Sequence, residues 1–267
     1  MPCYHPMKGY RSREVNPGTG RRSIVFQAAK GYSDLPVVVP CGQCVGCRLE
    51  RSRQWAVRCV HEAQMWPENC FITLTYSPEH LPNPPSLDVT HFQKFMKRLR
   101  KKYEPKTIRF FHCGEYGERN NRPHYHALLF NHDFEDKRLW QKSSSGALLY
   151  TSEDLQSLWP YGFSSLGAAT FQSAAYVARY IMKKVTGEPA SEHYEYADPE
   201  TGELFPLCPE YVTMSRRPGL GKKWLQKYQS DVWPDDFVVL EQKKHRPPRF
   251  YDQQVEAEDE IYFRKVK

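Results

Sequence analysis

Long apolar runs are missing from this sequence of 267 residues. No uninterrupted stretch approaches the ~20 apolar residues that a membrane-spanning helix needs. The opening residues, MPCYHP, also lack the apolar segment of a signal peptide. We therefore expect a globular protein that works in a cytosol and has no membrane among its partners.

Two sequence signatures of nucleotide and nucleobase enzymes are absent as well. There is no G-x-x-x-x-G-K-[ST] loop and no internal repeat, so the chain encodes no nucleotide-driven helicase. The H-x-E and P-C-x-x-C signature of zinc deaminases does not occur either. Any strand separation that the protein needs must come from another protein.

Basic residues outnumber acidic ones. Lysine and arginine total 38 against 31 aspartates and glutamates, and 14% of the residues are aromatic. Most of the excess lies in the first two thirds of the chain, whereas acidic residues crowd the last dozen positions. This balance suits a nucleic-acid partner, although an ordinary basic protein can have the same composition.

Three of the eight cysteines form a C-x-x-C-x-x-C run, PCGQCVGCR, at Cys41, Cys44 and Cys47. Without an export signal, cysteines in such a run indicate metal binding rather than disulfides. The two glycines of the run permit the tight turns of a chelating loop. Of the five other cysteines, Cys3 is a candidate for the same metal site, and four are expected to be ordinary buried residues: Cys59, Cys70, Cys113 and Cys208.

A closed structural site needs a fourth ligand beside these three thiolates. Cys3 is the leading candidate, and His5 and His61 are alternatives. Four thiolates, or three and an imidazole, predict structural zinc. An iron–sulfur cluster is the rival, but the ferredoxin run has a further cysteine followed by proline, which this sequence lacks.

The central part of the chain alternates strand and helix patterns. Strands are expected over 71–76, 107–113, 124–130 and 163–169, with helices starting after Asp88 or Thr90 and over 152–159. The order strand, helix, strand, strand, helix, strand predicts an α+β fold, the split βαβ or ferredoxin-like arrangement. We expect an antiparallel sheet with its helices on one face and the other face free.

The flanking regions divide the chain into three expected parts. Residues 1–47 form an arm with the cysteine loop and little regular structure beyond a strand over 35–39, and residues 48–185 form the core. Within the core, helices are expected over 45–66 and 171–185. Residues 186–267 form an extension packed on the core, with a hairpin insertion over 188–206, a strand over 211–215 and a basic turn before a helix.

Two histidines flank one residue at the head of an apolar strand, in RPHYHALLF. Because a strand alternates its side chains, His124 and His126 point to one face and Tyr125 to the other. Glu115 ends the preceding strand and could complete a site of two imidazoles and a carboxylate, with Glu118 in reserve. Such a mixed set fits Mg²⁺ or Mn²⁺ with positions left for substrate oxygens.

Basic and aromatic residues follow on the later helix, in YVARYIMKK. Tyr176 and Tyr180 are four residues apart and therefore share a helix face, with Lys183 and Lys184 one turn further along. The turn that carries Arg216 and Arg217 could hold phosphates, although such a turn is often only a solvated loop.

Taken in order, these motifs resemble the HUH endonuclease superfamily, and most closely the replication initiators of the gokushovirus branch of microviruses. The strand over 71–76 corresponds to the first motif of that family, His124-Tyr125-His126 to its histidine motif, and Tyr176 to Lys183 to its tyrosine motif. The tyrosines follow the histidines, as in replication initiators and unlike conjugative relaxases. The resemblance spans about residues 41–225. It does not include the attached helicase domain that larger viral initiators have.

The resemblance implies rolling-circle replication in the cytoplasm of a bacterial host. A tyrosine would cut single-stranded DNA at the origin and form a 5′-phosphotyrosine, and the second tyrosine would allow the ends to be rejoined. Lys183 would neutralise the phosphate or tyrosinate, with Arg179 and Lys184 as weaker candidates. A host helicase and polymerase would be partners.

Two other functions stay open on the sequence. The first is a non-enzymatic, zinc-stabilised nucleic-acid binding protein with structural histidines. The second is a zinc hydrolase or deaminase built on His124 and His126. If the protein binds single-stranded DNA, bases are expected to stack on Tyr125, Phe110 or Trp159. Each of these residues could equally belong to the core.

Overall fold

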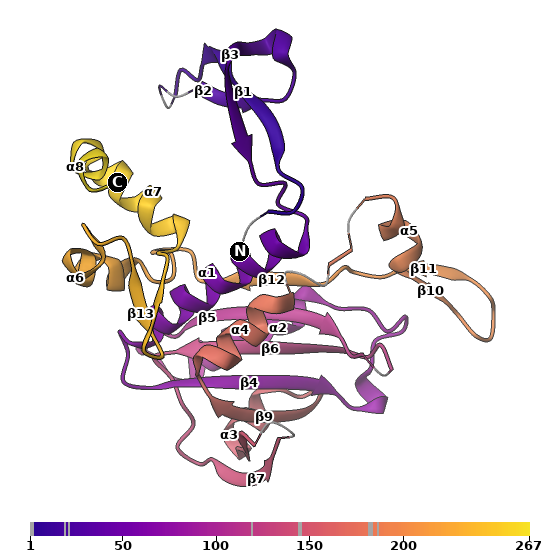
Figure 1. Ribbon diagram of the computed structural model, residues 1–267. Coiled ribbons are helices and arrows are strands. Elements are labelled where there is room, and N and C mark those ends of the chain that lie inside the picture. Colours follow the sequence, from indigo (N-terminus) through magenta and orange to yellow (C-terminus); the bar gives the residue numbers. More distant parts are fainter. Residues whose placement is uncertain are drawn as a thin grey trace. The chain divides into compact units, whose positions relative to one another are not determined.

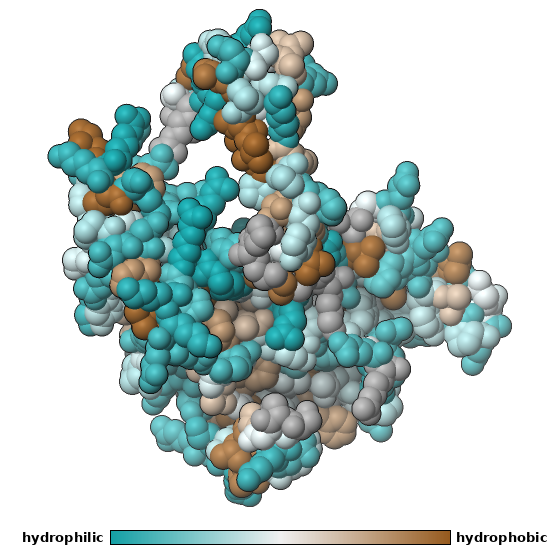
Figure 2. Space-filling view, viewed as in Figure 1, coloured by the Kyte–Doolittle hydropathy of each residue, from teal (hydrophilic) through white to brown (hydrophobic). Residues whose placement is uncertain are grey.

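The computed structural model describes residues 3–18, 20, 22–118, 120–143, 146–180, 184–185 and 187–267 (Figure 1). The chain forms two compact units, Met1–Arg51 and Ser52–Lys267, which we treat separately. Among the described residues, no helix combines the length and the apolar content needed to cross a membrane. Hydrophilic residues cover most of the visible face, and the apolar patches between them are small (Figure 2).

The first unit contains a three-stranded antiparallel sheet in the order β2-β1-β3. Its elements are β1 (Met7–Val15), β2 (Arg22–Val25), the 3-10 turn η1 (Ala28–Lys30) and β3 (Gly31–Val39). The expectation of an arm with one short strand was wrong. Most side chains of these strands are exposed, so backbone pairing holds the sheet and the sequence shows little hydrophobic alternation to reveal it.

The second unit is built on a seven-stranded sheet in the order β12-β5-β6-β4-β9-β8-β7, which confirms the predicted α+β fold with an antiparallel sheet. The strands are β4 (Asn69–Tyr76), β5 (Arg109–Tyr116), β6 (Pro123–Phe130), β7 (Arg138–Lys142), β8 (Leu148–Thr151), β9 (Gly162–Ala168) and β12 (Tyr211–Met214). The sequence had not revealed the β7–β8 hairpin, which widens the sheet at one edge. Every second residue of β4 is buried, whereas β6 is buried along nearly its whole length because both of its faces are covered.

One face of the sheet packs against α2 (Val89–Lys102) and α3 (Glu153–Leu158). Asp88 is the N-cap of α2, since its side chain accepts a hydrogen bond from the backbone N–H of Thr90. Tyr125 and Trp159 are both 0% exposed in this core, so the expectation that they stack on DNA bases was wrong. Phe110 is half-buried and packs against the same core.

The opposite face was expected to be free, and this was wrong. It packs against α1 (Val45–Ala63) and α4 (Phe171–Arg179), and Figure 1 shows α4 lying over the sheet beside β6. Small residues such as Ala174 and Ala178 let α4 approach Leu128 and Phe130 of β6 closely. The helix expected over 171–185 ends at Arg179, with Tyr180 as its C-cap.

The remaining helices and strands follow α4, the helix that carries Tyr176. They are α5 (Pro189–His193), a hairpin of β10 (Glu195–Ala197) and β11 (Leu204–Pro206), α6 (Lys222–Val232), β13 (Val238–Leu240), β14 (Lys243–His245), α7 (Arg249–Glu258) and α8 (Glu260–Val266). The 3-10 turn η2 (Pro78–His80) follows β4. Trp224, Trp233 and Tyr251 form a third core with Val57 of α1, so these last helices pack against the same helix that covers the sheet.

Candidate metal and tyrosine site

Strand register brings the three expected ligands together. Glu115 of β5 lies directly opposite His124 of β6, and His126 follows on the same face. The Oε1 atom of Glu115 is 2.5 Å from Nε2 of His124 and 2.9 Å from Nε2 of His126. One ligand atom from each of the three residues lies within 4.8 Å of the other two. The reserve candidate Glu118 lies exposed in the turn after β5 and is not part of this group.

The two rings are held in place through their other nitrogens. Nδ1 of His124 lies 3.1 Å from the carbonyl oxygen of Arg122, which can only accept, so this nitrogen carries the hydrogen. Nδ1 of His126 lies 2.9 Å from the hydroxyl of Thr73. Partners of this kind orient imidazoles that bind metals. The Nε2 atom of neutral His124 is then a lone-pair donor to a cation.

This arrangement fits a divalent cation. The Nε2 atom of neutral His124 carries no hydrogen and cannot donate to the Glu115 carboxylate, 2.5 Å away. The two atoms lie favourably at this distance only when a proton or a metal ion lies between them. Burial raises the pKa of Glu115, but the side chains of His124 and His126 at hydrogen-bond distance outweigh burial and leave this pKa below its ordinary value. The carboxyl is therefore an anion at neutral pH. Two imidazoles and one carboxylate suit Mg²⁺ or Mn²⁺, with coordination positions left for phosphate oxygens.

Both tyrosines lie against this group. A capping box of Thr170 and Ser173 starts α4, and the helix then places the ring of Tyr176 5.1 Å from the ring of His126. The ring of Tyr180 lies 6.0 Å from the same imidazole and 5.0 Å from that of Tyr176. The predicted pair therefore shares one helix face beside the histidines.

The two tyrosines differ in their surroundings. Tyr176 is 38% exposed, whereas Tyr180 is only 5% exposed. Burial raises the pKa of Tyr176, and a hydrogen bond with Tyr180 partly offsets this. Burial raises the pKa of Tyr180 much further above its ordinary value, and the bond to Tyr176 adds to the rise.

The predicted DNA-binding cations occupy different places. Lys183 lies outside the described residues. Arg179 is exposed in the last turn of α4, and Lys184 is exposed beyond the end of that helix. Arg216 and Arg217 are exposed in the turn after β12. Ser215 bonds to Phe110, at the beginning of β5, so this turn lies about 20 Å along the strand from the carboxylate of the site.

A buried ion pair fixes that basic turn. Arg109 donates to the carboxylate of Glu62 at 2.7 Å and to the carbonyl oxygen of Pro218 at 2.7 Å. The second oxygen of Glu62 accepts from the backbone N–H of Gly221 at 2.8 Å. The turn is therefore held by residues of both α1 and β5, and no sequence pattern had indicated the Arg109–Glu62 pair.

The polar partners of the histidines were also missed. Thr73 and Thr75 alternate in FITLTY, so the strand pattern alone places both hydroxyls on one face. That this is the histidine face follows only from the pairing of β4 with β6, in which Thr73 is opposite His126 and Thr75 is opposite His124.

The first unit holds the second candidate metal group. The sulfur atoms of Cys3, Cys41, Cys44 and Cys47 lie within 4.8 Å of one another. Cys3 Sγ is 3.6 Å from Cys41 Sγ and 3.9 Å from Cys44 Sγ. Hydrogen bonds from backbone N–H groups, first from Cys47 and then from Tyr4, lower the pKa of the Cys44 thiol to about 6. Four thiols in this geometry fit structural zinc.

Neither histidine alternative belongs to this cysteine group. His5 is exposed, and His61 is buried with Nδ1 2.8 Å from the hydroxyl of Tyr251. Among the other cysteines, Cys59, Cys70 and Cys113 are buried as expected, and Cys208 is half-buried.

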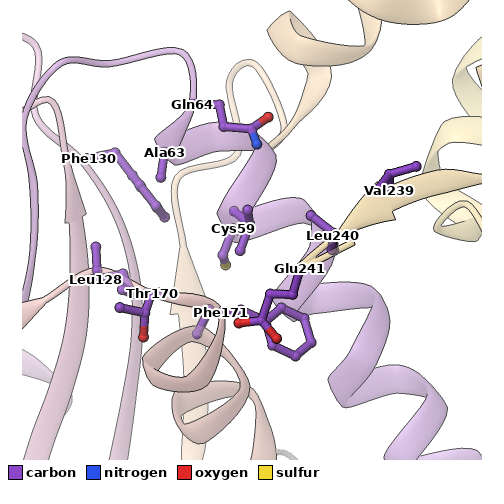
Figure 3. Close-up of a pocket in the computed structure, with 13 residues that line it drawn as sticks. Cys59, Ala63, Gln64, Leu128, Phe130, Thr170, Phe171, Val239, Leu240 and Glu241 are labelled. Carbon is purple, nitrogen blue, oxygen red and sulfur yellow. The ribbon is translucent and has the colours of Figure 1, made fainter. Parts of the chain in front are cut away.

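A separate pocket of about 400 Å³ lies at the opposite end of α4 from the tyrosines (Figure 3). Cys59 of α1, Phe171 of α4 and Leu240 of β13 line it together with Leu128 and Phe130 of β6. Its lining is mostly apolar, and neither of the two candidate metal groups contributes to it.

Comparison with known proteins bears directly on this geometry. A family model described as replication-associated protein ORF2/G2P matches residues 69–185, which include Glu115, both histidines and both tyrosines. The cysteine group lies outside the matched range. No solved structure matches the chain.

Curated relatives extend the similarity over most of the chain. Replication-associated protein VP4 of Bdellovibrio phage phiMH2K is 34% identical over 94% of this chain and 76% of its own length. Replication-associated protein ORF2 of Spiroplasma virus 4 is 34% identical over 86% of this chain and 72% of its own length. Replication-associated protein ORF4 of Chlamydia phage 1 is 34% identical over a shorter region, 55% of this chain.

Proposed function

The chain belongs to the replication-associated proteins of microviruses, and from this membership we propose that it starts rolling-circle replication by nicking single-stranded DNA at the phage origin. The observation that carries the proposal is the position of Tyr176, accessible and 5.1 Å from the ring of His126, beside a group that can hold a metal. The activity is that of a metal-dependent DNA nickase and strand transferase.

The sheet supports an HUH-type core. The strands β4, β5, β6 and β9, with α2 after the first and α3 after the third, follow the chain order of the split βαβ arrangement. They lie in the sheet as β5-β6-β4-β9, which puts the histidine strand between β5, which carries Glu115, and β4, which carries Thr73. We place the nuclease core at residues 48–185, between the cysteine-containing arm of 1–47 and the extension of 186–267.

In the cleavage step, the hydroxyl oxygen of Tyr176 attacks the scissile phosphorus. The tyrosine hydroxyl gives up its proton, the bond from phosphorus to the 3′ oxygen breaks, and the leaving 3′ oxygen takes up a proton. This gives a 5′-phosphotyrosine and a free 3′ hydroxyl on the other fragment. The hydrogen bond from Tyr180 stabilises the developing tyrosinate of Tyr176. Mg²⁺ or Mn²⁺ held by Glu115, His124 and His126 would supply positive charge to the phosphate oxygens.

Rejoining reverses this chemistry. A 3′ hydroxyl attacks the phosphotyrosine, the new phosphodiester forms and the tyrosine is released. Tyr180, next to Tyr176 on the same helix, is the group for the second cut when replication returns to the origin. The phosphate charge would be met by Lys183, Arg179 and Lys184.

Other parts of the chain would hold DNA or stabilise the fold. Arg216 and Arg217 form a basic contact away from the cut, and zinc on Cys3, Cys41, Cys44 and Cys47 stabilises the first unit. Host polymerase extends the 3′ end and a host helicase separates the strands, in the cytoplasm of the bacterial host.

A covalent adduct tests the proposal. Labelled single-stranded fragments that tile the phage genome are incubated with the protein and Mn²⁺, then separated under denaturing conditions. At least one fragment should give an adduct that EDTA prevents, that Mg²⁺ or Mn²⁺ restores, and that the double variant Tyr176→Phe, Tyr180→Phe does not form. A non-enzymatic, zinc-stabilised nucleic-acid binding protein would bind fragments without any adduct, and that result would refute the nickase.

A further inference from the structure

An exposed phenylalanine lies in line with the metal group. Cross-strand pairs form one row across four strands, with Phe163 of β9 opposite Thr75 of β4, Thr75 opposite His124 of β6, and His124 opposite Glu115 of β5. Directly opposed residues of paired strands point to the same face of a sheet. The ring of Phe163 therefore stands on the face that carries the candidate metal ligands.

The neighbours of Phe163 along β9 confirm which face it takes. Ser164 and Leu166 are buried on the α3 side, where the hydroxyl of Ser164 donates to the side chain of Gln156 at 3.0 Å. Alternation sends Phe163 to the opposite side. There it is 66% exposed, although large apolar side chains on a sheet are normally covered.

The next two rows on this face show where α4 covers the sheet. His126 lies in the row of Thr73, Phe71 lies one same-face row further along β4, and both contact the ring of Tyr176. Phe163 lies past them, in the row of Thr75 and His124, and its exposure shows that α4 and the other described residues leave its ring uncovered.

Distance and chemistry identify the ligand. Two strand spacings separate Phe163 from His124, about 10 Å, so the ring lies within about one to three nucleotides of a phosphate bound at the metal group. An exposed aromatic ring beside a backbone-binding group is the stacking element of single-stranded DNA sites. We propose that Phe163 stacks on a base of single-stranded DNA next to the scissile phosphate, an inference that rests on the proposed nicking function.

Thr75 connects the ring to the site. Its hydroxyl donates to the carbonyl oxygen of Phe163 at 3.2 Å, which leaves the oxygen lone pairs as acceptors toward the substrate. The row thus offers, in order, a stacking surface, a hydrogen-bond acceptor and the metal ligands. This order lets the DNA strand run across the sheet, perpendicular to the protein strands.

Binding of DNA without cleavage tests the inference. The affinity of the full chain for a single-stranded oligonucleotide is measured by fluorescence anisotropy in EDTA, with the fragment that gives the adduct or, if none does, with the fragment bound most tightly. Phe163→Ala should weaken binding about 5- to 150-fold, whereas Phe163→Trp should keep it within about threefold. Ile261→Ala, which changes an equally apolar side chain that is 72% exposed on α8, should have no effect.

Abasic nucleotides identify the base. One abasic position near the cut should weaken binding to the wild-type protein by a similar factor and should weaken binding to Phe163→Ala less than about twofold. Equal losses for both proteins at every position would overturn the inference. Loss of a dimer on Phe163→Ala, seen by size-exclusion chromatography, would also overturn it by assigning the ring to a second copy. If no fragment forms an adduct with the wild-type protein, nicking fails while the binding result still decides the role of Phe163.

Discussion

Tyr176 and Tyr180 lie one turn apart on the same helix face, with ring centres 5.0 Å apart, yet the first is 38% exposed and the second only 5%. A scissile phosphate can therefore reach Tyr176 in this structure, whereas Tyr180 becomes accessible only if its neighbours move. The exposed fraction of the side chain therefore distinguishes two tyrosines that look equivalent in the sequence.

The first prediction concerns the order of the tyrosines. Tyr176→Phe should lower the rate of the first adduct by at least about 100-fold, because Tyr176 is the more accessible of the two tyrosines that contact His126. Tyr180→Phe should keep the first cut within about tenfold and lose the second, measured with a fragment that carries two origins. The reverse pattern would show that Tyr180 attacks first.

The second prediction concerns the hydroxyl that holds His126. Thr73→Val keeps the shape of the side chain but removes the partner of Nδ1, 2.9 Å away, so Mn²⁺ affinity should fall about 10- to 100-fold. Isothermal titration of the DNA-free protein measures this. Thr75→Val is the matched control, since the Thr75 hydroxyl bonds to the backbone of Phe163 instead of a histidine. Equal losses in both variants would contradict the positioning role of Thr73.

The third prediction concerns the cysteine group. Elemental analysis of the purified chain should find about one zinc per molecule, and Cys44→Ser should lose it because three thiolates no longer close the site. Cys208→Ser should retain the metal, since Cys208 lies outside the group. Zinc retained by Cys44→Ser, or iron in place of zinc, would contradict the assignment.

The fourth prediction concerns the buried ion pair under the basic turn. Arg109→Met leaves the Glu62 carboxylate buried without its cation and should lower the free energy of unfolding by about 3–5 kcal/mol in urea titrations. The control is Lys102→Met, which breaks a half-exposed pair with Asp154 and should cost about 1 kcal/mol or less. A small effect of Arg109→Met would show that the turn does not depend on this pair.

The fifth prediction concerns acid stability. Burial lowers the pKa of His61 to about 3, whereas an unfolded histidine has a pKa of 6.5. Between these two pKa values the imidazole of His61 is therefore protonated in the unfolded state and neutral in the folded state. Its contribution to the free energy of unfolding is complete above pH ~6.5 and declines by about 1 kcal/mol per pH unit below that pH. Urea titrations from pH 7 to pH 4 measure the slope. His61→Phe should lower the slope by about 1 kcal/mol per pH unit and leave the part due to His112 and His132, whose pKa values burial also lowers. His193→Gln, at an exposed position, should leave the slope unchanged.

Much of the candidate site was predicted from the sequence, because its parts depend on local periodicity. Strand alternation puts His124 and His126 on one face wherever β6 lies, and helical spacing does the same for Tyr176 and Tyr180. The C-x-x-C-x-x-C run brings three thiols together by chain proximity alone, and the structure adds Cys3 to them. The order of strands and helices likewise indicated an antiparallel α+β sheet, which the structure confirms.

Features that depend on long-range packing were not predictable in this way. The strands of the first unit bury few side chains, so no hydrophobic pattern revealed them. Tyr125 and Trp159 were offered both as DNA-stacking residues and as core residues, because the sequence does not distinguish a buried aromatic residue from an exposed one. Only the packing of α2 and α3 shows that both are buried.

The sequence by itself determined the ligand types and their faces, since alternation within one element needs no partner. Only the tertiary structure decided that Glu115 meets His124, because strand register is set by the whole sheet and a shift of one residue would turn the carboxylate to the other face. Tertiary packing also exposed Tyr176 and covered Tyr180, and placed Phe163 in the row of the metal ligands. These relationships join residues distant in the chain, and their geometry follows from the shared packing of the sheet and α4.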